Sequence, residues 1–207
     1  KPLNLAHVER SHVESLQRYI GDKYKVPTSA VRSLVATAWD VGGAMKLDPL
    51  LLLAVMAIES RFDPFAESGV GAQGLMQVMT RVHHKKFEPF GGAHAAWRPD
   101  ANIEVGAQIL KDCINRRGSV AGGLTCYVGS SGTASSYGRK VLAERDRLRA
   151  VFMPGHDATL AAGRDEDAAE SVASSAVSRV AEGGQQRLAR NEVTASLTLR
   201  TQTVAGM

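Results

Sequence analysis

The stretch DPLLLLAVMAIESRF, residues 48–62, decides the fold of this chain. Asp48 is a good capping side chain and Pro49 suits the first helical position, so the sequence predicts that a helix begins here. Residues 50–58 are apolar on every side, which is typical of a helix buried at the centre of a domain. We expect this helix to end near Arg61, because a proline follows at position 64 and disfavours its continuation.

Glu59 closes the apolar run and is the first candidate for chemistry. A carboxyl group at the end of a buried helix loses solvation of its charged form, so its pKa is expected to rise. A protonated carboxyl near neutral pH can donate a proton to a leaving-group oxygen. A glutamate at a helix end is more often solvated, and the run alone favours that interpretation. The residues that follow it favour chemistry.

The remainder of residues 1–153 also predicts helices, so the expected fold class is mainly α. Helical spacing of apolar residues predicts a helix ending at Gly21 and another that begins after Pro27 with Thr28 or Ser29 as its cap. Further helical segments are expected at about 75–82, 101–116, 124–127 and 137–152. Glycine and proline content predicts loops at 65–74 and 85–97.

The composition separates a domain at 1–153 from a tail at 154–207. The whole chain has 207 residues, of which 44% are hydrophobic and 22% charged, as in an ordinary globular protein. From residue 154 the chain is a low-complexity segment rich in Ala and Ser, without aromatic residues. Such a segment buries little surface, so we expect a flexible or partner-dependent C-terminal tail. The longest apolar run, residues 49–58, is about half the length that a membrane-spanning helix needs, so no membrane span is expected.

Charge and motifs exclude several functions. The net charge of +4 favours an anionic polymer as partner, but the basic residues are not interleaved with aromatics, which argues against nucleic acid. The glycines of residues 69–74 match a dinucleotide-binding pattern, yet RFDPFAES before them is not a strand. The chain lacks H-E-x-x-H and G-x-S-x-G motifs, so neither a metal, a cofactor nor a serine nucleophile is expected. Cys113 and Cys126 exclude a four-cysteine zinc site, and they are either two buried thiols or one bridge formed in an oxidising compartment.

Five short motifs occur in a suggestive order. They are Glu59-Ser60, GLMQ at 74–77, DANIEVG at 100–106, CYVG at 126–129 and Tyr137 before a final helix. Together they resemble the soluble lytic transglycosylase family, whose lysozyme-like catalytic domain cleaves peptidoglycan. The resemblance covers about residues 47–148. The chain departs from the family at Val128, where the family usually has Asn after the tyrosine.

The resemblance implies a role for each matched residue. Glu59 would be the catalytic acid and base. The residues that would bind or shape the glycan groove around it are Ser68, Gln77, Met79, Asn102, Tyr127 and Tyr137. The partner would be the glycan strands of peptidoglycan, with no metal and no cofactor. A periplasmic or cell-envelope location would follow, although no targeting segment is visible.

Three functions remain open from the sequence. The first is a lytic transglycosylase that uses Glu59 alone and forms a 1,6-anhydro ring, in the service of an envelope secretion or pilus machine. The second is a hydrolytic lysozyme with a second acid, for which the candidates are Asp63, Glu67, Glu88 and Asp100. The third is a catalytically weak peptidoglycan-binding assembly protein, which the departure at Val128 and the tail keep open.

Overall fold

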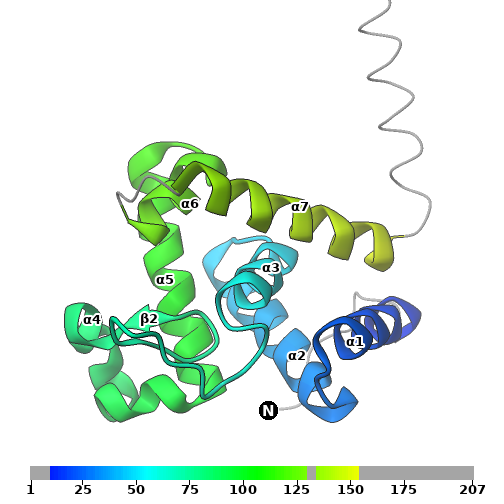
Figure 1. The fold of residues 1–207 in the computed structure, drawn as a ribbon, viewed down its shortest axis with the longest axis horizontal. Coiled ribbons are helices and arrows are strands. Elements are labelled where there is room, and N and C mark those ends of the chain that lie inside the picture. Colours follow the sequence, from blue (N-terminus) through cyan, green and yellow to red (C-terminus); the bar gives the residue numbers. More distant parts are fainter. Residues whose placement is uncertain (1–9, 130–133, 154–207) are drawn as a thin grey trace, which may run out of the picture. The chain divides into compact units, whose positions relative to one another are not determined.

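The computed structural model describes residues 10–129 and 134–153, and these form a mainly α fold, as expected (Figure 1). The α-helices are α1 (Arg10–Tyr24), α2 (Thr28–Met45), α3 (Pro49–Glu59), α4 (Thr80–Phe87), α5 (Pro99–Arg117), α6 (Val120–Val128) and α7 (Ala134–Phe152). Between them lie two short strands, β1 (Ala72–Gln73) and β2 (Val78–Met79), and two 3₁₀ helices, η1 (Glu88–Phe90) and η2 (Ala93–Trp97). The expected tail, 154–207, lies outside the described residues.

Helix α3 forms the centre of the core. Every residue from Leu50 to Ala57 is buried, as the apolar run predicted. Figure 1 shows α3 between α2 and α7, and both helices pack against it. The predicted start is confirmed, because the Asp48 side chain accepts a hydrogen bond from the Leu50 N–H at 2.9 Å. With all its sides covered, α3 can present only its C-terminal end to a ligand.

Two predictions about the first helices are wrong. Helix α1 continues through Gly21 to Tyr24, because a glycine inside a helix lowers its stability without forcing it to end. Helix α2 takes Pro27 as its N-cap residue and makes no side-chain capping bond, so neither Thr28 nor Ser29 is the cap. The proline fixes its own φ at −56°, and its carbonyl oxygen accepts the Val31 N–H.

The helical segment expected at 75–82 is replaced mainly by a β-hairpin. Ala72 pairs with Met79 and Gln73 with Val78 in an antiparallel register, and α4 begins only at Thr80. Two positive φ angles, +77° at Gly74 and +46° at Gln77, reverse the chain in between. The expected loop at 85–97 is also partly ordered, because α4 extends to Phe87 and is followed by η1 and η2. Short segments of this kind carry no period that a sequence pattern could reveal.

A buried carboxylate joins α7 to α1. Glu144 is 1% exposed and accepts bonds from Lys23 Nζ at 2.6 Å, Tyr19 OH at 3.1 Å and Arg147 Nη1 at 3.0 Å. A buried charge is tolerated only when it is paired and hydrogen-bonded, as here. These contacts fix the position of α7, which matters because α7 carries Tyr137.

The two cysteines form a disulfide. Cys113 of α5 and Cys126 of α6 are bonded, with their Cα atoms 5.6 Å apart, which decides between the alternatives that the sequence left open.

Within the described ranges, no helix is both long enough and apolar enough to cross a bilayer.

The capping bond of Asp48 gives a first prediction. Asp48→Ala should lower the free energy of unfolding by about 1 kcal/mol, because the Leu50 N–H loses its acceptor at the start of the central helix. Asp48→Asn is the matched control, since Asn caps as well as Asp but cannot pair with Arg149, whose Nη2 lies 3.1 Å from Oδ2. Denaturant unfolding should rank wild type and Asn close together and Ala below both. An Ala variant equal to the Asn variant would contradict the capping role.

Candidate active site

Glu59 is the last residue of α3 and lies half-buried at the end of the core helix. The chain turns sharply after it, through Ser60 and then Arg61 and Phe62, which both have positive φ angles, +54° and +67°. Because the chain leaves the helix axis at these residues, no further helical turn follows Glu59. Its carboxyl therefore lies at the end of α3. Phe62 is 3% exposed and anchors the turn in the core.

Burial is the main electrostatic influence on Glu59. It raises the pKa of the carboxyl above 4.5, because the charged form is poorly solvated there. Tyr137 OH donates to Glu59 Oε1 at 2.7 Å, which opposes part of that rise by favouring the carboxylate. Burial first, and then the neighbouring Glu59 charge, raise the pKa of Tyr137 far above its usual range. Tyr137 therefore stays a donor, and Glu59 is a carboxyl able to hold or release a proton.

Tyr127 is the third ionisable group in the cluster. Burial first, and then the nearby Glu59 charge, raise the pKa of Tyr127 well above 10. Its OH donates to the Met76 carbonyl oxygen at 2.8 Å, so its hydroxyl is committed to the loop rather than to Glu59. The predicted trio of Glu59, Tyr127 and Tyr137, which come from α3, α6 and α7, is thus brought together in space.

Ser60 ties the turn of the hairpin to the end of α3. Its buried Oγ donates to the Leu75 carbonyl at 2.8 Å and lies 3.2 Å from the Met56 carbonyl. The motif Glu59-Ser60 predicts no role for the serine, and its direct adjacency to Glu59 is the signal in the sequence that points to it. The bond keeps the GLMQ segment beside the catalytic candidate.

Gln77 stabilises the same loop from within. Its Nε2 donates to the Ala66 and Gly74 carbonyls at 2.8 and 3.0 Å, and its own backbone adopts a left-handed φ of +46°. A non-glycine residue holds such a conformation only where its surroundings enforce it, and these are often functional sites. Gln77 therefore orders the loop at residues 66–77, in addition to any contact with a ligand.

Ser68 and Met79 lie at the hairpin, on either side of Ala72. Ser68 Oγ accepts the Ala72 N–H at 3.0 Å, and Met79 pairs with Ala72 across the strands. Both side chains are partly exposed, as a groove-lining position requires. No hydrogen bond in the described part of the chain joins either residue to Glu59.

Asn102 lies beneath the site. It is 1% exposed, its Oδ1 accepts the Met76 N–H at 2.8 Å, and its Nδ2 donates to the Gln73 and Ala96 carbonyls, both at 2.9 Å. Every polar atom of this side chain is therefore bonded to backbone, which favours a role in shaping the groove over a direct contact with the sugar. The packing is also tight, since a methyl group on Gly74 would lie 2.4 Å from Asn102 Nδ2 and from the Ala96 carbonyl oxygen. Asn102 is therefore buried beneath the loop and supports it from below.

The candidate second acids lie elsewhere. Asp63 Oδ1 accepts the Phe65 N–H in a turn, and Glu67 Oε1 accepts Gln73 Nε2 at 3.0 Å. Asp100 binds Arg98 at 2.6 Å, a contact that lowers its pKa, and Glu88 is exposed at the start of η1. Across residues 10–129 and 134–153, no carboxylate contributes to the pKa shift of Glu59. The same residues contain no cluster of His, Cys, Asp and Glu suited to a metal ion.

A family comparison agrees with this arrangement. The model of the transglycosylase SLT domain matches residues 41–149, just over half of the chain, and includes α3, the hairpin and most of α7. The chain belongs to the transglycosylase SLT family. The resemblance that the motifs indicated is therefore confirmed.

Individual relatives match over parts of their length. The transglycosylase of Enterobacteria phage PRD1 is 36% identical over 101 residues, which cover 47% of this chain and 36% of that protein. The chain thus spans about a third of the length of this curated relative. Among solved structures, the 70 kDa soluble lytic transglycosylase SLT70 of Escherichia coli is 19% identical, with a TM-score of 0.48, over 68% of this chain and 31% of that one. An inactive mutant of the lytic transglycosylase Slt from Pseudomonas aeruginosa is 23% identical, with a TM-score of 0.41, over 56% and 22%.

The raised pKa of Glu59 predicts a pH-dependent change in stability. Its folded pKa exceeds the unfolded value, so the protonated group costs nothing at low pH, and stability is lost as the pH rises from about 4.5 through the folded pKa. Glu59→Gln cannot ionise and should escape this loss. Thermal unfolding measured between pH 4 and pH 8 should show a variant equal to wild type at the acid end and more stable at the neutral end. A gain that does not depend on pH would contradict the shift.

Asn102 gives a prediction about the loop. Asn102→Asp keeps the shape but turns the donating Nδ2 into an oxygen that faces two carbonyl oxygens. The free energy of unfolding should fall by about 3 kcal/mol or more. Asn115→Asp, an exposed position on the same helix, is the control for the added charge and should change it little. Denaturant unfolding of both variants tests this prediction. Equal losses in the two variants would contradict the supporting role of Asn102 under the loop.

Proposed function

We propose that this protein is a lytic transglycosylase that cleaves the β-1,4 bond between N-acetylmuramic acid and N-acetylglucosamine in peptidoglycan and leaves a 1,6-anhydro end. One observation carries the proposal: a half-buried Glu59 carboxyl with a raised pKa, hydrogen-bonded by Tyr137 at 2.7 Å, to which no second carboxylate is coupled within the described residues. Family membership in the SLT domain supports the same reaction.

In the first step Glu59 acts as the acid. The protonated carboxyl gives its proton to the glycosidic oxygen while the bond to C1 of the muramic acid breaks, and the N-acetylglucosamine leaves with a free hydroxyl. The N-acetyl oxygen of the substrate supports the positive charge that develops at C1. Burial favours this step, because it keeps Glu59 protonated at a pH where an exposed glutamate is ionised.

In the second step Glu59 acts as the base. The carboxylate removes the proton from the C6 hydroxyl of the same sugar, and that oxygen bonds to C1 and closes the anhydro ring. No water is consumed, and Glu59 ends the cycle protonated, as it began. Tyr137 OH stabilises the carboxylate between the two steps through its short hydrogen bond.

The other predicted residues provide the groove. Ser68 and Met79 flank the hairpin with partly exposed side chains and would contact the sugars, while Gln77 would add an amide oxygen beside them. Tyr127 fixes the Met76 carbonyl and Asn102 the Met76 N–H, so both would act by holding the loop in place. The change at Val128 falls one residue after Tyr127 and leaves that bond intact.

The disulfide supports a location for the protein. Disulfides persist in oxidising compartments, so a bond between Cys113 and Cys126 favours the periplasm or another part of the cell envelope, where peptidoglycan lies. We further propose that the enzyme opens the wall for an envelope secretion or pilus machine, with the segment after residue 154 as the partner-binding arm.

Product analysis with two matched variants tests the reaction. Purified peptidoglycan digested in H₂¹⁸O should release anhydro-muropeptides without ¹⁸O, because no water enters the product. Glu59→Gln should reduce the rate by at least about a thousandfold, and Glu67→Gln, the exposed alternative, should leave it within about threefold.

Other outcomes would favour the other two functions. Reducing ends that carry ¹⁸O, lost in Glu67→Gln, would favour a hydrolytic lysozyme. Peptidoglycan binding without any products would favour an assembly protein. Anhydro products from the Glu59→Gln variant would contradict the role of Glu59.

A further inference from the structure

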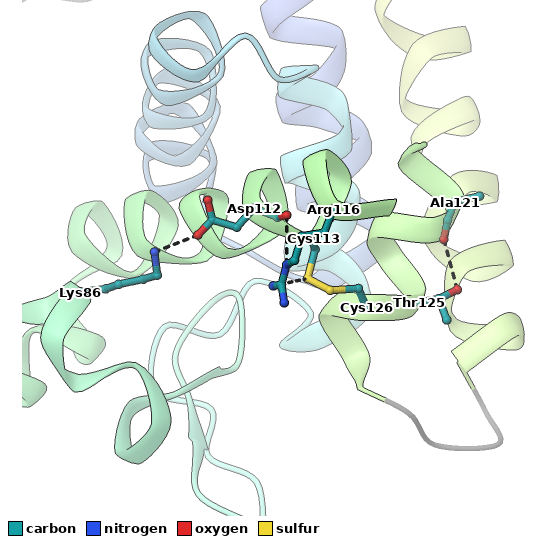
Figure 2. The surroundings of a disulfide bond; sticks show 7 residues. All are labelled: Lys86, Asp112, Cys113, Arg116, Ala121, Thr125 and Cys126. Carbon is teal, nitrogen blue, oxygen red and sulfur yellow. Dashed lines mark hydrogen bonds and ion pairs between the residues drawn. A yellow bond between two sulfur atoms is a disulfide. The ribbon is translucent and has the colours of Figure 1, made fainter. Parts of the chain in front are cut away.

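The disulfide lies next in sequence to a residue of the candidate site. Figure 2 shows the bond between Cys113 of α5 and Cys126 of α6, with the Arg116 side chain alongside it. Cys126 immediately precedes Tyr127, whose OH donates to the Met76 carbonyl at 2.8 Å. The position of the disulfide therefore bears directly on the position of that tyrosine.

The two helices that the disulfide joins hold the two sides of one residue. The Met76 N–H donates to Asn102 Oδ1 of α5, and the Met76 carbonyl accepts from Tyr127 of α6. If α6 moves relative to α5, the two bonds cannot both keep their lengths. Cys113–Cys126 is the covalent link that opposes this movement.

The packing of α5 against α6 and against the Met76 loop leaves no free space between them. A methyl group on Gly123 of α6 would lie 2.4 Å from Ile114 Cγ1 and 2.9 Å from its Cα, so the two helices touch at backbone level there. A methyl group on Gly106 of α5 would lie 2.6 Å from Met76 Sδ, so α5 presses equally closely on the loop.

Helix α6 needs an external restraint. It has nine residues, two of which are adjacent glycines, Gly122 and Gly123. Each glycine costs about 1 kcal/mol of helix stability, and a helix of this length is marginal by itself. Loss of the covalent bond would let α6 fray, and its C-terminal turn carries Tyr127.

We propose that the Cys113–Cys126 disulfide is a positioning element of the active site, which acts through Tyr127 to hold Met76 and the left-handed Gln77 next to Glu59. The inference rests on the proposed function, because that function makes this loop part of the catalytic site. It adds that catalysis depends on the oxidised state of two residues that do not touch the substrate.

Amide hydrogen exchange tests the inference independently of activity. In the Cys113→Ala/Cys126→Ala variant, exchange at the Met76 and Gln77 amides should be about tenfold faster, because the Met76 N–H is bonded to Asn102 of α5 and the Gln77 N–H to Gly74 of the loop. Leu16→Ala, a buried change in α1, is the control for a general loss of stability. It should not speed exchange at these two amides more than at other amides of the core. Unchanged exchange at both amides would overturn the proposal, whether or not the protein cleaves peptidoglycan.

A double-mutant cycle tests the route through Tyr127. Tyr127→Phe alone should also speed exchange at these amides, and adding the cysteine changes to it should have less than about a twofold further effect. Effects that multiply would show that the disulfide acts by another route. Anhydro-muropeptide release should follow the same non-additive pattern, with each variant slower by about ten- to a hundredfold. If the wild type releases anhydro-muropeptides and the cysteine variant releases them equally fast, the inference is overturned and the proposed function stands.

A reciprocal measurement covers the case in which the cysteine variant does not fold. If the disulfide supports the Tyr127 bond, the bond must support the disulfide equally. In glutathione buffers at equilibrium, Tyr127→Phe should therefore be reduced at Cys113–Cys126 several-fold more readily than wild type, and more readily than Leu16→Ala. Equal reduction of the three proteins would contradict the coupling.

Discussion

The structure depends on the burial of helix α3, which ends in the half-buried carboxyl group of Glu59. Helix α3 has no exposed face, so the rest of the domain is arranged around its sides and only Glu59 at its end remains for chemistry. The polar neighbours of Glu59 all come from elements that pack near this end. Tyr137 lies on α7 and Tyr127 on α6. The loop that follows Ser60 continues directly from α3 and is bonded back to it by the Ser60 side chain.

The site separates the acid from the residues that hold the site in shape. Among the hydrogen bonds of the described site, the one from Tyr137 is received by the Glu59 carboxyl itself. Asn102, Tyr127 and Ser60 instead bond to backbone atoms of residues 75 and 76, and Gln77 bonds to those of 66 and 74. Such a division allows a short, strained loop to be rigid without placing other charges near Glu59, which would change its pKa.

Much of this was predictable from the sequence, and the exceptions have physical reasons. The cap at Asp48, the buried helix and the family were readable because they rest on local chemistry or on ordered motifs. The hairpin was not, because two-residue strands have no period, and its turn depends on a left-handed Gln77 held by distant carbonyls. The true place of Asn102 was also hidden, since only the fold shows that both ends of its amide face backbone. The disulfide remained undecided because 13 residues of separation say nothing about whether two helices face each other.

Burial raises the pKa of the Glu59 carboxyl, so the group binds its proton more tightly than an exposed glutamate does. Its pKa can be measured directly by ¹³C NMR titration of protein labelled at the glutamate side-chain carboxyl, with the Glu59 signal assigned by its absence in Glu59→Gln. We predict a midpoint clearly above 4.5 that rises further in Tyr137→Phe, where the donor to the carboxylate is lost. A Glu59 midpoint at or below 4.5 in the wild-type protein would contradict this prediction.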